Sequence, residues 1–283
     1  MKIGLLDSGV GGLSVLREIR LLLPAASLHY VGDSAWCPYG TKSPEVIQRR
    51  VFEIADHLLG HGAEILVIAC NSATIQAVGA LRASYPLPVV GMEPGVKPAA
   101  ERTRSGVVGV LATEASLAGE KFHQLVSAHA SGVRVITRPC PRFVELVEAG
   151  ILDGPEAEAA VDEAVAPLVE AGADVFVLGC THYPFLRPVI ERRLPEGSVV
   201  IDTGPAVARR VESLLTERQE TRGAHPANSD FGLRASDFPP VFVETTGSPE
   251  QLNRLLPRLL PGVAATVSGC RIAGDPGGEE RIR

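Results

Sequence analysis

Residues 62–73 read GAEILVIACNSA, and residues 172–183 read GADVFVLGCTHY. Each stretch begins with Gly-Ala and an acidic residue, continues through an apolar run and a small residue, and reaches a cysteine that polar side chains follow. The two cysteines, Cys70 and Cys180, are 110 positions apart (180 − 70). Because short apolar runs of this kind are typical of strands buried on both faces, the sequence predicts each cysteine at the end of a strand in a parallel sheet.

Two further pairs of strand-like segments recur at similar offsets. They are IGLLDSG (3–9) with VGVLATE (108–114), and VVGME (89–93) with VVIDT (199–203). The first pair places Ser8 opposite Thr113. One such match could be chance, but three in the same order, at offsets of 105 to 110 residues, favour duplication of a domain.

Strand-like runs alternate with helix-like stretches along most of the chain, as in a parallel sheet covered by helices. The predicted strands are 2–6, 27–31, 65–69, 89–91, 106–111, 133–137, 175–179 and 199–201, and the predicted helices include 12–23, 44–61, 117–127 and 156–171. We therefore expect an α/β fold of two similar lobes, each a mainly parallel sheet flanked by helices and related by a pseudo-twofold. Ligands bind beyond the carboxyl ends of such strands, so the active site is expected in the cleft between the lobes.

Composition excludes several classes of protein. The 283 residues are 45% hydrophobic and 21% charged, with a mean hydropathy of +0.16, which is ordinary for a globular protein. A net charge of −6 and a pI near 5.7 give no electrostatic case for binding nucleic acid or an anionic membrane. The N-terminus does not resemble a signal peptide and no long apolar run follows, so a cytoplasmic location is expected.

The five cysteines are odd in number and widely spread, without a CxxC pair or zinc-ligand spacing, so free thiols and no metal site are expected. A free cysteine usually acts as a small buried apolar residue. We keep that interpretation for Cys37, Cys140 and Cys270. For Cys70 and Cys180, the repeated placement at a strand-to-helix junction favours a chemical role.

Polar residues follow both of these cysteines. Asn71 and Ser72 are good N-cap residues for a helix after Cys70, and the helix dipole is expected to lower the pKa of this thiol toward neutrality. Thr181 and Pro184 suggest the same arrangement after Cys180, where His182 could transfer protons.

Two facing thiols suit one reaction without a metal or cofactor. A thiolate removes a proton from one face of a carbon, and a thiol on the opposite face delivers another, so that the carbon inverts.

The segment DSGVGG (7–12) offers groups for a charged ligand. Asp7 could hold a substrate ammonium or orient a thiol proton, while Ser8 and the glycine-rich turn offer donors to a carboxylate. A phosphate or dinucleotide loop is the alternative. The segment lacks the G-x-G-x-x-G spacing and a P-loop lysine, so this alternative has little support.

Four segments resemble the glutamate racemases of the aspartate/glutamate racemase superfamily: GLLDSGVGGLSV, YVGDSAWCPYGTKS, VIACNSAT and LGCTHYPFLRPVI. The likeness runs from residue 3 to about residue 210. Aspartate and hydantoin racemases share the two-cysteine plan but do not match the DSGVGG and CPYG segments taken together. The resemblance implies an isomerase without cofactors that interconverts L- and D-glutamate, supplies D-glutamate for peptidoglycan and forms a homodimer.

The resemblance also implies the site residues. Cys70 would take the proton from D-glutamate with help from Asp7, and Cys180 would take it from L-glutamate with help from His182 and Glu148. Glu145, one helical turn before Glu148, is the alternative acidic residue. The implied substrate-binding residues are Asp7, Ser8, Tyr39, Gly40, Asn71, Ser72, Thr113, Thr181 and His182. Ser72 departs from the family, which more often has Thr there, but it keeps the hydroxyl.

The family's chain crosses between lobes near Glu93-Pro94-Gly95 and returns near Thr203-Gly204-Pro205, and these Pro/Gly pairs suit crossover points. The first lobe would then hold residues 1–94 plus 207–283, and the second 95–206. In the C-terminal part we expect a loop or hairpin over 217–238, a strand over 241–247, a helix beginning at Ser248-Pro249-Glu250 and a solvated tail over 274–283.

Three alternatives stay open at this point. A non-catalytic two-lobed binding protein would need the cleft but not the thiols, so it would tolerate Cys→Ser changes. A redox or metal protein would use Cys70 and Cys180 as a pair, which zinc analysis and thiol titration would detect. The same chemistry could also act on aspartate or another amino acid.

Overall fold

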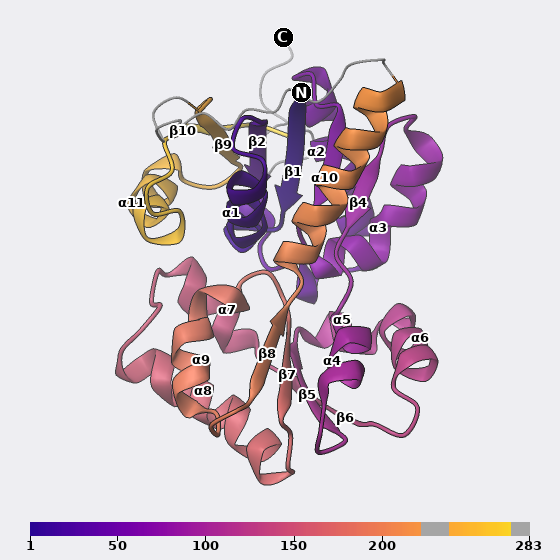
Figure 1. Ribbon diagram of the computed structural model, residues 1–283. Coiled ribbons are helices and arrows are strands. Elements are labelled where there is room, and N and C mark those ends of the chain that lie inside the picture. Colours follow the sequence, from indigo (N-terminus) through magenta and orange to yellow (C-terminus); the bar gives the residue numbers. More distant parts are fainter. Residues whose placement is uncertain (222–237, 273–283) are drawn as a thin grey trace.

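The computed structural model describes residues 1–221 and 238–272, which form two parallel sheets in two stacked lobes (Figure 1). The first sheet has the order β10-β9-β2-β1-β3-β4. Its strands are β1 (Lys2–Asp7), β2 (Ser27–Gly32), β3 (Ile65–Ile68), β4 (Val89–Gly91), β9 (Val241–Thr245) and β10 (Ala265–Gly269). The second sheet has the order β6-β5-β7-β8. Its strands are β5 (Val107–Ala112), β6 (Arg134–Pro139), β7 (Val175–Gly179) and β8 (Val199–Asp202).

The two sheets repeat one plan. The order β2-β1-β3-β4 in the first corresponds to β6-β5-β7-β8 in the second, and every pair is parallel. The two quoted stretches form β3 and β7, which occupy equivalent positions beside β1 and β5. The predicted two-lobed α/β fold is confirmed, and the recurring segments of the sequence lie at equivalent places in it.

Helices cover both faces of each sheet. Those in the first half of the chain are α1 (Leu13–Leu22), α2 (Pro44–Gly60), α3 (Asn71–Ser84), α4 (Val96–Arg102), α5 (Glu114–Ala118) and α6 (Glu120–His129). Those in the second half are α7 (Pro141–Glu148), α8 (Pro155–Glu170), α9 (Arg187–Arg193), α10 (Gly204–Thr221) and α11 (Pro249–Leu259). Short 3-10 turns are η1 (Ser34–Trp36), η2 (Tyr39–Thr41) and η3 (Tyr183–Leu186).

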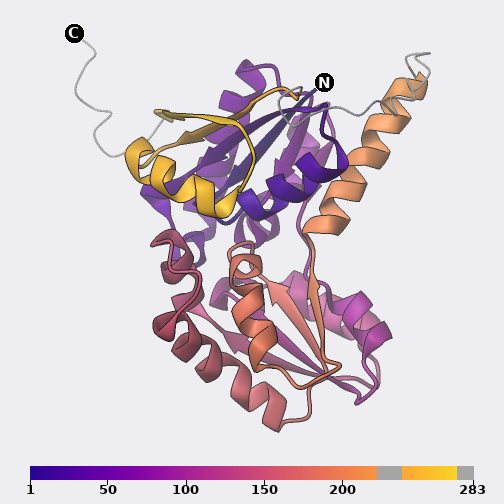
Figure 2. The same cartoon turned by 60° about the vertical axis from the view of Figure 1, so that its left-hand side comes forward.

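Alternation along each strand divides the core of the first lobe in two. On β2, Leu28 and Tyr30 join a cluster with α1, α10 and α11, whereas Val31 joins a second cluster with α2 and α3. The first cluster continues into the second lobe through Phe143 of α7 and Phe176 of β7. Apolar packing therefore holds the two lobes together. The ribbon shows the two lobes stacked one on the other (Figure 2).

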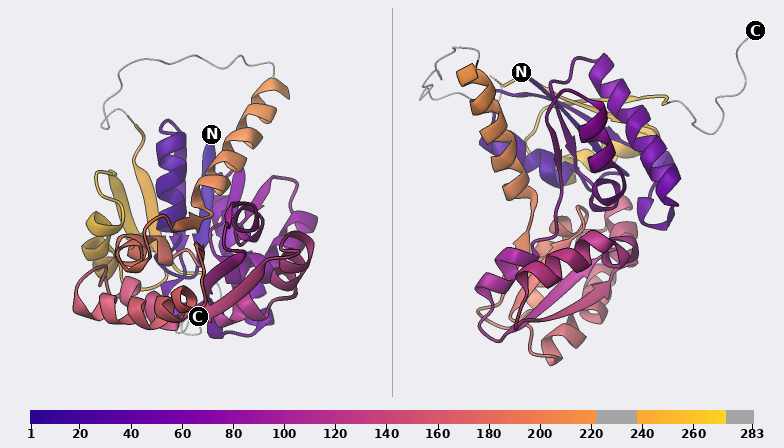
Figure 3. Two further views of the ribbon diagram at one scale, coloured as in Figure 1. Left: turned by 60° about the horizontal axis from the view of Figure 1, so that its bottom comes forward. Right: turned by 90° about the vertical axis from the view of Figure 1, so that its right-hand side faces the viewer.

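The chain passes to the second lobe after β4 and returns after β8 by α10, which packs against α1 of the first lobe (Figure 3). The strands therefore divide between the sheets as expected. The boundaries at 94/95 and 206/207 stay a prediction.

Two predicted elements differ from the structure. The single helix expected over 117–127 is two helices, α5 and α6, because Gly119 between them is extended (ψ 134°) and ends the first. The loop expected from residue 217 is wrong for its first five residues, since α10 continues to Thr221 through strong helix formers such as Glu217 and Arg218. The rest of that segment, 222–237, and the predicted tail over 274–283 lie outside the described residues.

The strand and helix predicted after the loop are present as β9 and α11. The Ser248 side chain accepts a hydrogen bond from the backbone N–H of Gln251 (3.2 Å) and caps α11, as its sequence predicted. Among the helices of the described ranges, none has both the length and the apolar content that a bilayer crossing requires.

Candidate active site

Cys70 and Cys180 both lie where a central strand ends, and they line one small cavity between the lobes. Cys70 is the residue that caps α3, two positions after β3. Cys180 directly follows β7 and leads into η3 rather than an α-helix, so Pro184 lies in a 3-10 turn and α9 begins only at Arg187. Both cysteines are buried and free.

The cavity measures about 20 Å³ and collects nearly all the predicted substrate-binding residues. Besides the two cysteines, the residues lining it are Ser8, Pro38, Tyr39, Gly40, Asn71, Ser72, Thr113, Val144, Thr181 and His182. Of the predicted set, only Asp7 does not line the cavity, and it is fully buried. None of the described residues lining the cavity is a lysine or an arginine. Hydroxyl, amide, thiol and imidazole groups therefore dominate its polar surface.

A chain of polar contacts supports Cys180. Its sulfur lies 3.6 Å from Nδ1 of His182, whose Nε2 lies 2.7 Å from Oε1 of Glu148. The same Glu148 oxygen accepts a hydrogen bond from the backbone N–H of Val10 at 2.8 Å. The arrangement gives the imidazole one nitrogen for the thiol and one for a carboxylate, which is the geometry of a proton relay.

The charges of this pair reinforce each other. Burial alone would lower the pKa of His182, but its hydrogen bonds to Cys180, Cys37 and Glu148 outweigh burial and raise the pKa well above its usual value. Burial has the opposite effect on an acid and would raise the pKa of Glu148. The hydrogen bond and the positive charge of His182, together with the Val10 N–H, outweigh burial and hold the pKa of Glu148 below its usual value. The raised pKa of His182 and the lowered pKa of Glu148 both favour an imidazolium–carboxylate pair at neutral pH.

The glycine-rich turn of residues 7–12 fits tightly against this pair. A methyl group on Gly9 would overlap the Glu148 carboxylate, and one on Gly11 would overlap the His182 ring. The Ser14 hydroxyl, just after the turn, donates to the carbonyl of Thr181 at 2.8 Å. The glycines therefore let the backbone of the first lobe approach the His182 and Glu148 side chains of the second.

The Asp7 carboxylate is fully buried. One oxygen, Oδ2, accepts hydrogen bonds from the backbone N–H of Gly12 (2.8 Å) and Gly9 (3.4 Å), while Oδ1 has no hydrogen-bond partner. Burial, partly opposed by the charge of His182, raises the pKa of Asp7. Asp7 therefore has one oxygen available for an ammonium or a thiol proton, as its predicted role requires.

The predicted low pKa of Cys70 is wrong for this arrangement. Burial, with a smaller contribution from the charge of Asp7, raises the pKa of Cys70 well above its usual value, and the opposing effect of the Ala73 backbone N–H is too small to offset it. The Cys70 sulfur also lies 3.9 Å from the Ser8 hydroxyl oxygen. Asn71 and Ser72, expected at the N-cap, instead form the first helical positions, because Cys70 itself has the extended N-cap conformation.

Two other predicted residues are placed clearly by the structure. Tyr39 lines the cavity, but its hydroxyl donates to Asp33 at 2.6 Å, and Asp33 in turn pairs with buried Arg50 at 2.7 Å. Glu145 is exposed, whereas Glu148 contacts His182, so the geometry favours Glu148 as the acidic residue of the Cys180 side.

Two side chains missed by the sequence analysis lie at the site. The sequence analysis interpreted Cys37 as a small buried apolar residue. Its sulfur lies 3.6 Å from Oε1 of Glu148, and burial raises the pKa of Cys37 to about 11. The ligand atoms of Cys37, Glu148 and His182 lie within 4.8 Å of one another, a spacing that could hold a metal ion. Tyr30 donates to the carbonyl of Gly9 at 2.6 Å and so fixes the glycine-rich turn.

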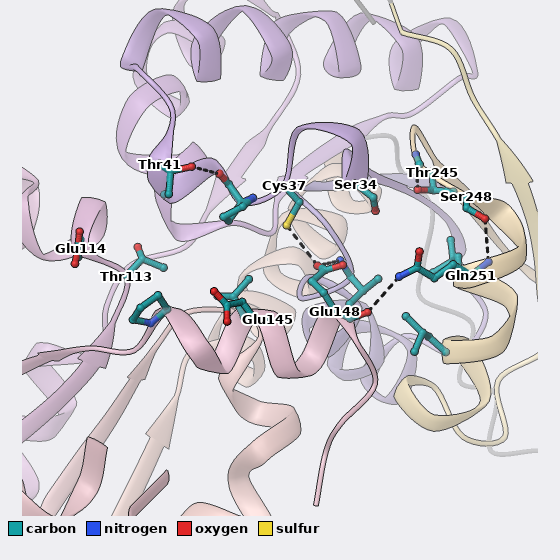
Figure 4. Close-up of a pocket in the computed structure, with 18 residues that line it drawn as sticks. Ser34, Cys37, Thr41, Thr113, Glu114, Glu145, Glu148, Thr245, Ser248 and Gln251 are labelled. Carbon is teal, nitrogen blue, oxygen red and sulfur yellow. Dashed lines mark hydrogen bonds between the residues drawn. The ribbon is translucent and has the colours of Figure 1, made fainter. Parts of the chain in front are cut away.

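A larger pocket of about 440 Å³ adjoins the cavity (Figure 4). Its walls come from the segment 34–41, from α7 and from α11, so both lobes contribute. Pro38, Gly40, Thr113 and Val144 line both spaces and form the partition between them. The pocket gives the buried cavity a neighbouring opening toward the surface.

Asn71 supplies a separate indication that the cavity binds a polar ligand. The residue is 4% exposed, and neither its amide nitrogen nor its amide oxygen has a hydrogen-bond partner. Because an unpaired buried amide is costly, such a group in the wall of a cavity is typical of a binding site.

Known proteins resemble this chain in sequence and in fold. The glutamate racemase of Ectopseudomonas mendocina is 55% identical over 218 residues, which cover 77% of this chain and 83% of that protein. The glutamate racemase of Pseudomonas aeruginosa is 48% identical over 258 residues, covering 91% and 93%. The crystal structure of Escherichia coli glutamate racemase in complex with L-glutamate and the activator UDP-MurNAc-ala superposes with a TM-score of 0.83 at 33% identity, covering 96% of this chain and 99% of that one.

The characteristic sequence of the Asp/Glu/Hydantoin racemases matches residues 3–211. That range spans the glycine-rich turn, both strand-end cysteines and the His182–Glu148 pair. Two duplicated lobes that bring two thiols to one cavity, together with this match and these relatives, make the chain a member of the Asp/Glu/Hydantoin racemase family.

Proposed function

We propose that this protein interconverts L-glutamate and D-glutamate by moving protons between the α-carbon and two thiols. The observation that carries the proposal is the position of Cys70 and Cys180, which reach one cavity from equivalent strand ends of two similar lobes. Because the lobes repeat one plan, equivalent groups approach the bound carbon from opposite sides. Inversion at that carbon is the reaction such a pair supports.

In the proposed direction from L- to D-glutamate, Cys180 as a thiolate removes the α-proton and Cys70 as a thiol donates its own proton to the opposite face. The products are D-glutamate, a Cys180 thiol and a Cys70 thiolate, and the reverse reaction restores the starting state. His182 exchanges protons with Cys180 through Nδ1, and the Glu148 carboxylate balances the charge of the imidazolium.

On the other side, Asp7 is proposed to assist Cys70. The high pKa that burial imposes on Cys70 means that its thiolate must be stabilised during turnover. The substrate ammonium is a suitable source of that stabilisation, because a positive charge close to a thiol lowers its pKa.

The proposed substrate contacts use neutral groups. The Asn71 amide, which lacks partners, and the hydroxyls of Ser8, Ser72, Thr113 and Thr181 are positioned to bind the two carboxylates of glutamate. The Ser72 and Thr113 hydroxyls are 3.4 Å apart and join the two lobes across the cavity. Tyr39 and Gly40 form part of the cavity wall. The Tyr39 hydroxyl is already engaged by Asp33.

Substrate entry requires the partition to move. A cavity of about 20 Å³ holds roughly one water molecule, far less than glutamate. We infer that glutamate enters from the adjoining pocket when Pro38 and Gly40 separate from Thr113 and Val144.

A role in supplying D-glutamate for peptidoglycan, a cytoplasmic location, a homodimeric state and no affinity for nucleic acid complete the proposal. They rest on the resemblance to glutamate racemases and, for nucleic acid, on the net charge of −6. Light scattering after gel filtration tests the dimer.

The test of the function is exchange of the α-proton in D₂O, followed by circular dichroism, across a panel of amino acids with no cofactor added. Glutamate is expected to exchange and racemise, with aspartate far slower. Exchange of aspartate without glutamate would overturn the substrate assignment, and a requirement for an added cofactor would overturn the mechanism.

A further inference from the structure

Three potential metal ligands converge on the α2-facing side of the first sheet, away from the cavity. The Nε2 atoms of His29 and His57 each lie 2.7 Å from the same oxygen, Oε2, of Glu244. The ligand atoms of all three residues lie within 4.8 Å of one another. None of the three lines the small cavity or the adjoining pocket.

The fold brings these residues together from distant parts of the chain. β9 lies beside β2 in the sheet (Figure 1). The two strands pair in parallel, with His29 opposite Phe242. Leu28 and Tyr30 point to the α1 side, so the alternation of β2 turns His29 toward α2. Glu244 follows the same rule on β9, and His57 lies in the last turn of α2.

The chemistry and the access of this cluster suit an ion. Two imidazoles and a carboxylate are ligands that Zn²⁺ and neighbouring first-row divalent ions accept. The His29 side chain is 5% exposed, whereas those of Glu244 and His57 are 16% and 19% exposed, so the cluster is closed toward the sheet and open toward solvent.

We propose that His29, His57 and Glu244 form a binding site for a divalent transition-metal ion, with Zn²⁺ as the preferred probe. Zinc–nitrogen bonds of about 2.0–2.1 Å place tetrahedral ligand atoms roughly 3.3 Å apart. The Glu244 carboxylate must therefore move slightly away from the two imidazole nitrogens when the metal binds. Each imidazole also loses its Nε2 proton, either to solvent or by a shift to Nδ1.

The fourth position is open to water or to His61. The exposed His61 ring lies 4.3 Å from the His57 ring and 5.3 Å from the His29 ring, centroid to centroid. Its Nδ1 is 2.8 Å from the carbonyl of His57, which leaves Nε2 directed away from that bond.

The bound ion would tie α2 and β2 to β9, a strand from the last part of the chain. Glu244 is 215 positions from His29 and 187 from His57, so the ion would cross-link the discontinuous parts of the first lobe. Stabilisation of the folded chain follows from mass action, because the ligands are assembled only in the native state. The site is independent of the proposed racemase activity.

The test is titration of the full chain, stripped with EDTA, against Zn²⁺ in competition with a chromogenic chelator, with the melting temperature measured in parallel. The variants are His57→Gln and the near-isosteric Glu244→Gln. His123→Gln, an exposed histidine on α6, is the matched control. Cys37→Ser probes the other group with metal-ligand spacing, Cys37–Glu148–His182.

The unaltered protein, His123→Gln and Cys37→Ser are expected to bind one equivalent of Zn²⁺ and to melt at a higher temperature with it. His57→Gln and Glu244→Gln are expected to lose both effects. Co²⁺ bound to the unaltered protein should give visible d–d bands without a thiolate charge-transfer band, a readout that needs no variant. Failure of the unaltered protein to bind, equal binding by His57→Gln, or a thiolate band with Co²⁺ would each overturn the proposal.

Discussion

The two cysteines occupy equivalent positions in the two lobes, but their surroundings differ. Cys180 has an imidazole 3.6 Å away, backed by a carboxylate 2.7 Å further on. Cys70 has the Ser8 hydroxyl at 3.9 Å and the buried charge of Asp7. Duplication therefore placed two thiols symmetrically, and the residues next to them made the two proton transfers chemically unequal.

The difference has an origin in the fold. The residue two positions after Cys180 is His182, whose ring reaches the sulfur because η3 begins with a tight turn there. After Cys70 the chain enters α3 at once, so Ser72 is directed toward Thr113 instead. The Cys70 side must draw its carboxylate from another strand end, that of β1, which carries Asp7.

Replacing either thiol is expected to have the largest effect. Cys70→Ser and Cys180→Ser should each reduce kcat by about 10²–10⁴-fold, because a hydroxyl is a far weaker acid–base group than a thiol at neutral pH. The loss should be similar for both, since each turnover uses both thiols. Steady-state racemisation followed by circular dichroism measures it. A variant that keeps wild-type kcat would show that its thiol takes no part in the proton transfer and would contradict the two-thiol mechanism.

His182→Asn tests the Cys180 side, where an imidazole and a carboxylate accompany the thiol. We expect kcat/KM to fall by roughly 10²-fold through loss of the proton-transfer partner of Cys180. Because the enantiomers have equal free energy, kcat/KM must fall by the same factor in both directions. The inequality of the two sides should appear instead in the primary deuterium isotope effect, which should grow for α-deuterated L-glutamate more than for the D-enantiomer.

Asp7→Asn is the matched change on the Cys70 side. Here the isotope effect should grow for α-deuterated D-glutamate, the reverse of the His182→Asn result. If the isotope effect grew equally for both enantiomers in both variants, Asp7 could not be assigned to the Cys70 side and His182 to the Cys180 side.

Glu148→Gln should have a smaller effect, about tenfold in kcat/KM, if loss of the carboxylate lowers the pKa of His182 by about one unit. The alkaline limb of the pH profile should then move to lower pH. Glu145→Gln, three residues earlier on α7, is the control and should leave the profile in place. A shift in the control and none in Glu148→Gln would reverse the choice between the two carboxylates.

The same pair predicts how stability varies with pH. The lowered pKa of Glu148 stabilises the fold above its unfolded value of about 4.3, and this contribution is lost as pH falls through the folded value. The raised pKa of His182 stabilises the fold below its unfolded value of about 6.5, and this is lost as pH rises through the folded value. The melting-temperature gap between the wild type and Glu148→Gln should therefore be widest between about pH 5 and 6.5.

Cys37→Ser is expected to have the smallest effect on kcat/KM, below about twofold, which corresponds to a change of about 0.3 unit in a pKa. With a pKa of about 11, the Cys37 thiol is neutral at physiological pH, and it contacts Glu148 and His182 without lining the cavity. A loss as large as that of Cys180→Ser would assign a third thiol to the chemistry.

Local patterns in the sequence predicted the strands and the position of both cysteines, because a buried parallel strand has a distinct composition and ends at a definite edge. Local patterns could not predict which side chains of the two lobes contact each other. Cys37 was assigned as a filler because no repeated strand end carries it, yet the fold brings it to Glu148, 111 positions away. The pKa of Cys70 was misjudged since the helix dipole is visible in sequence but the depth of burial is not.

The most direct test of two unequal thiols on opposite faces is α-proton exchange in D₂O by single variants, with L- and D-glutamate supplied separately. Each variant retains one thiol, which can remove a proton and return a deuteron on its own face without inversion. Cys70→Ala is expected to exchange L-glutamate only, and Cys180→Ala to exchange D-glutamate only, each with retained configuration. Exchange of both enantiomers by one variant, or inversion by either, would contradict the account.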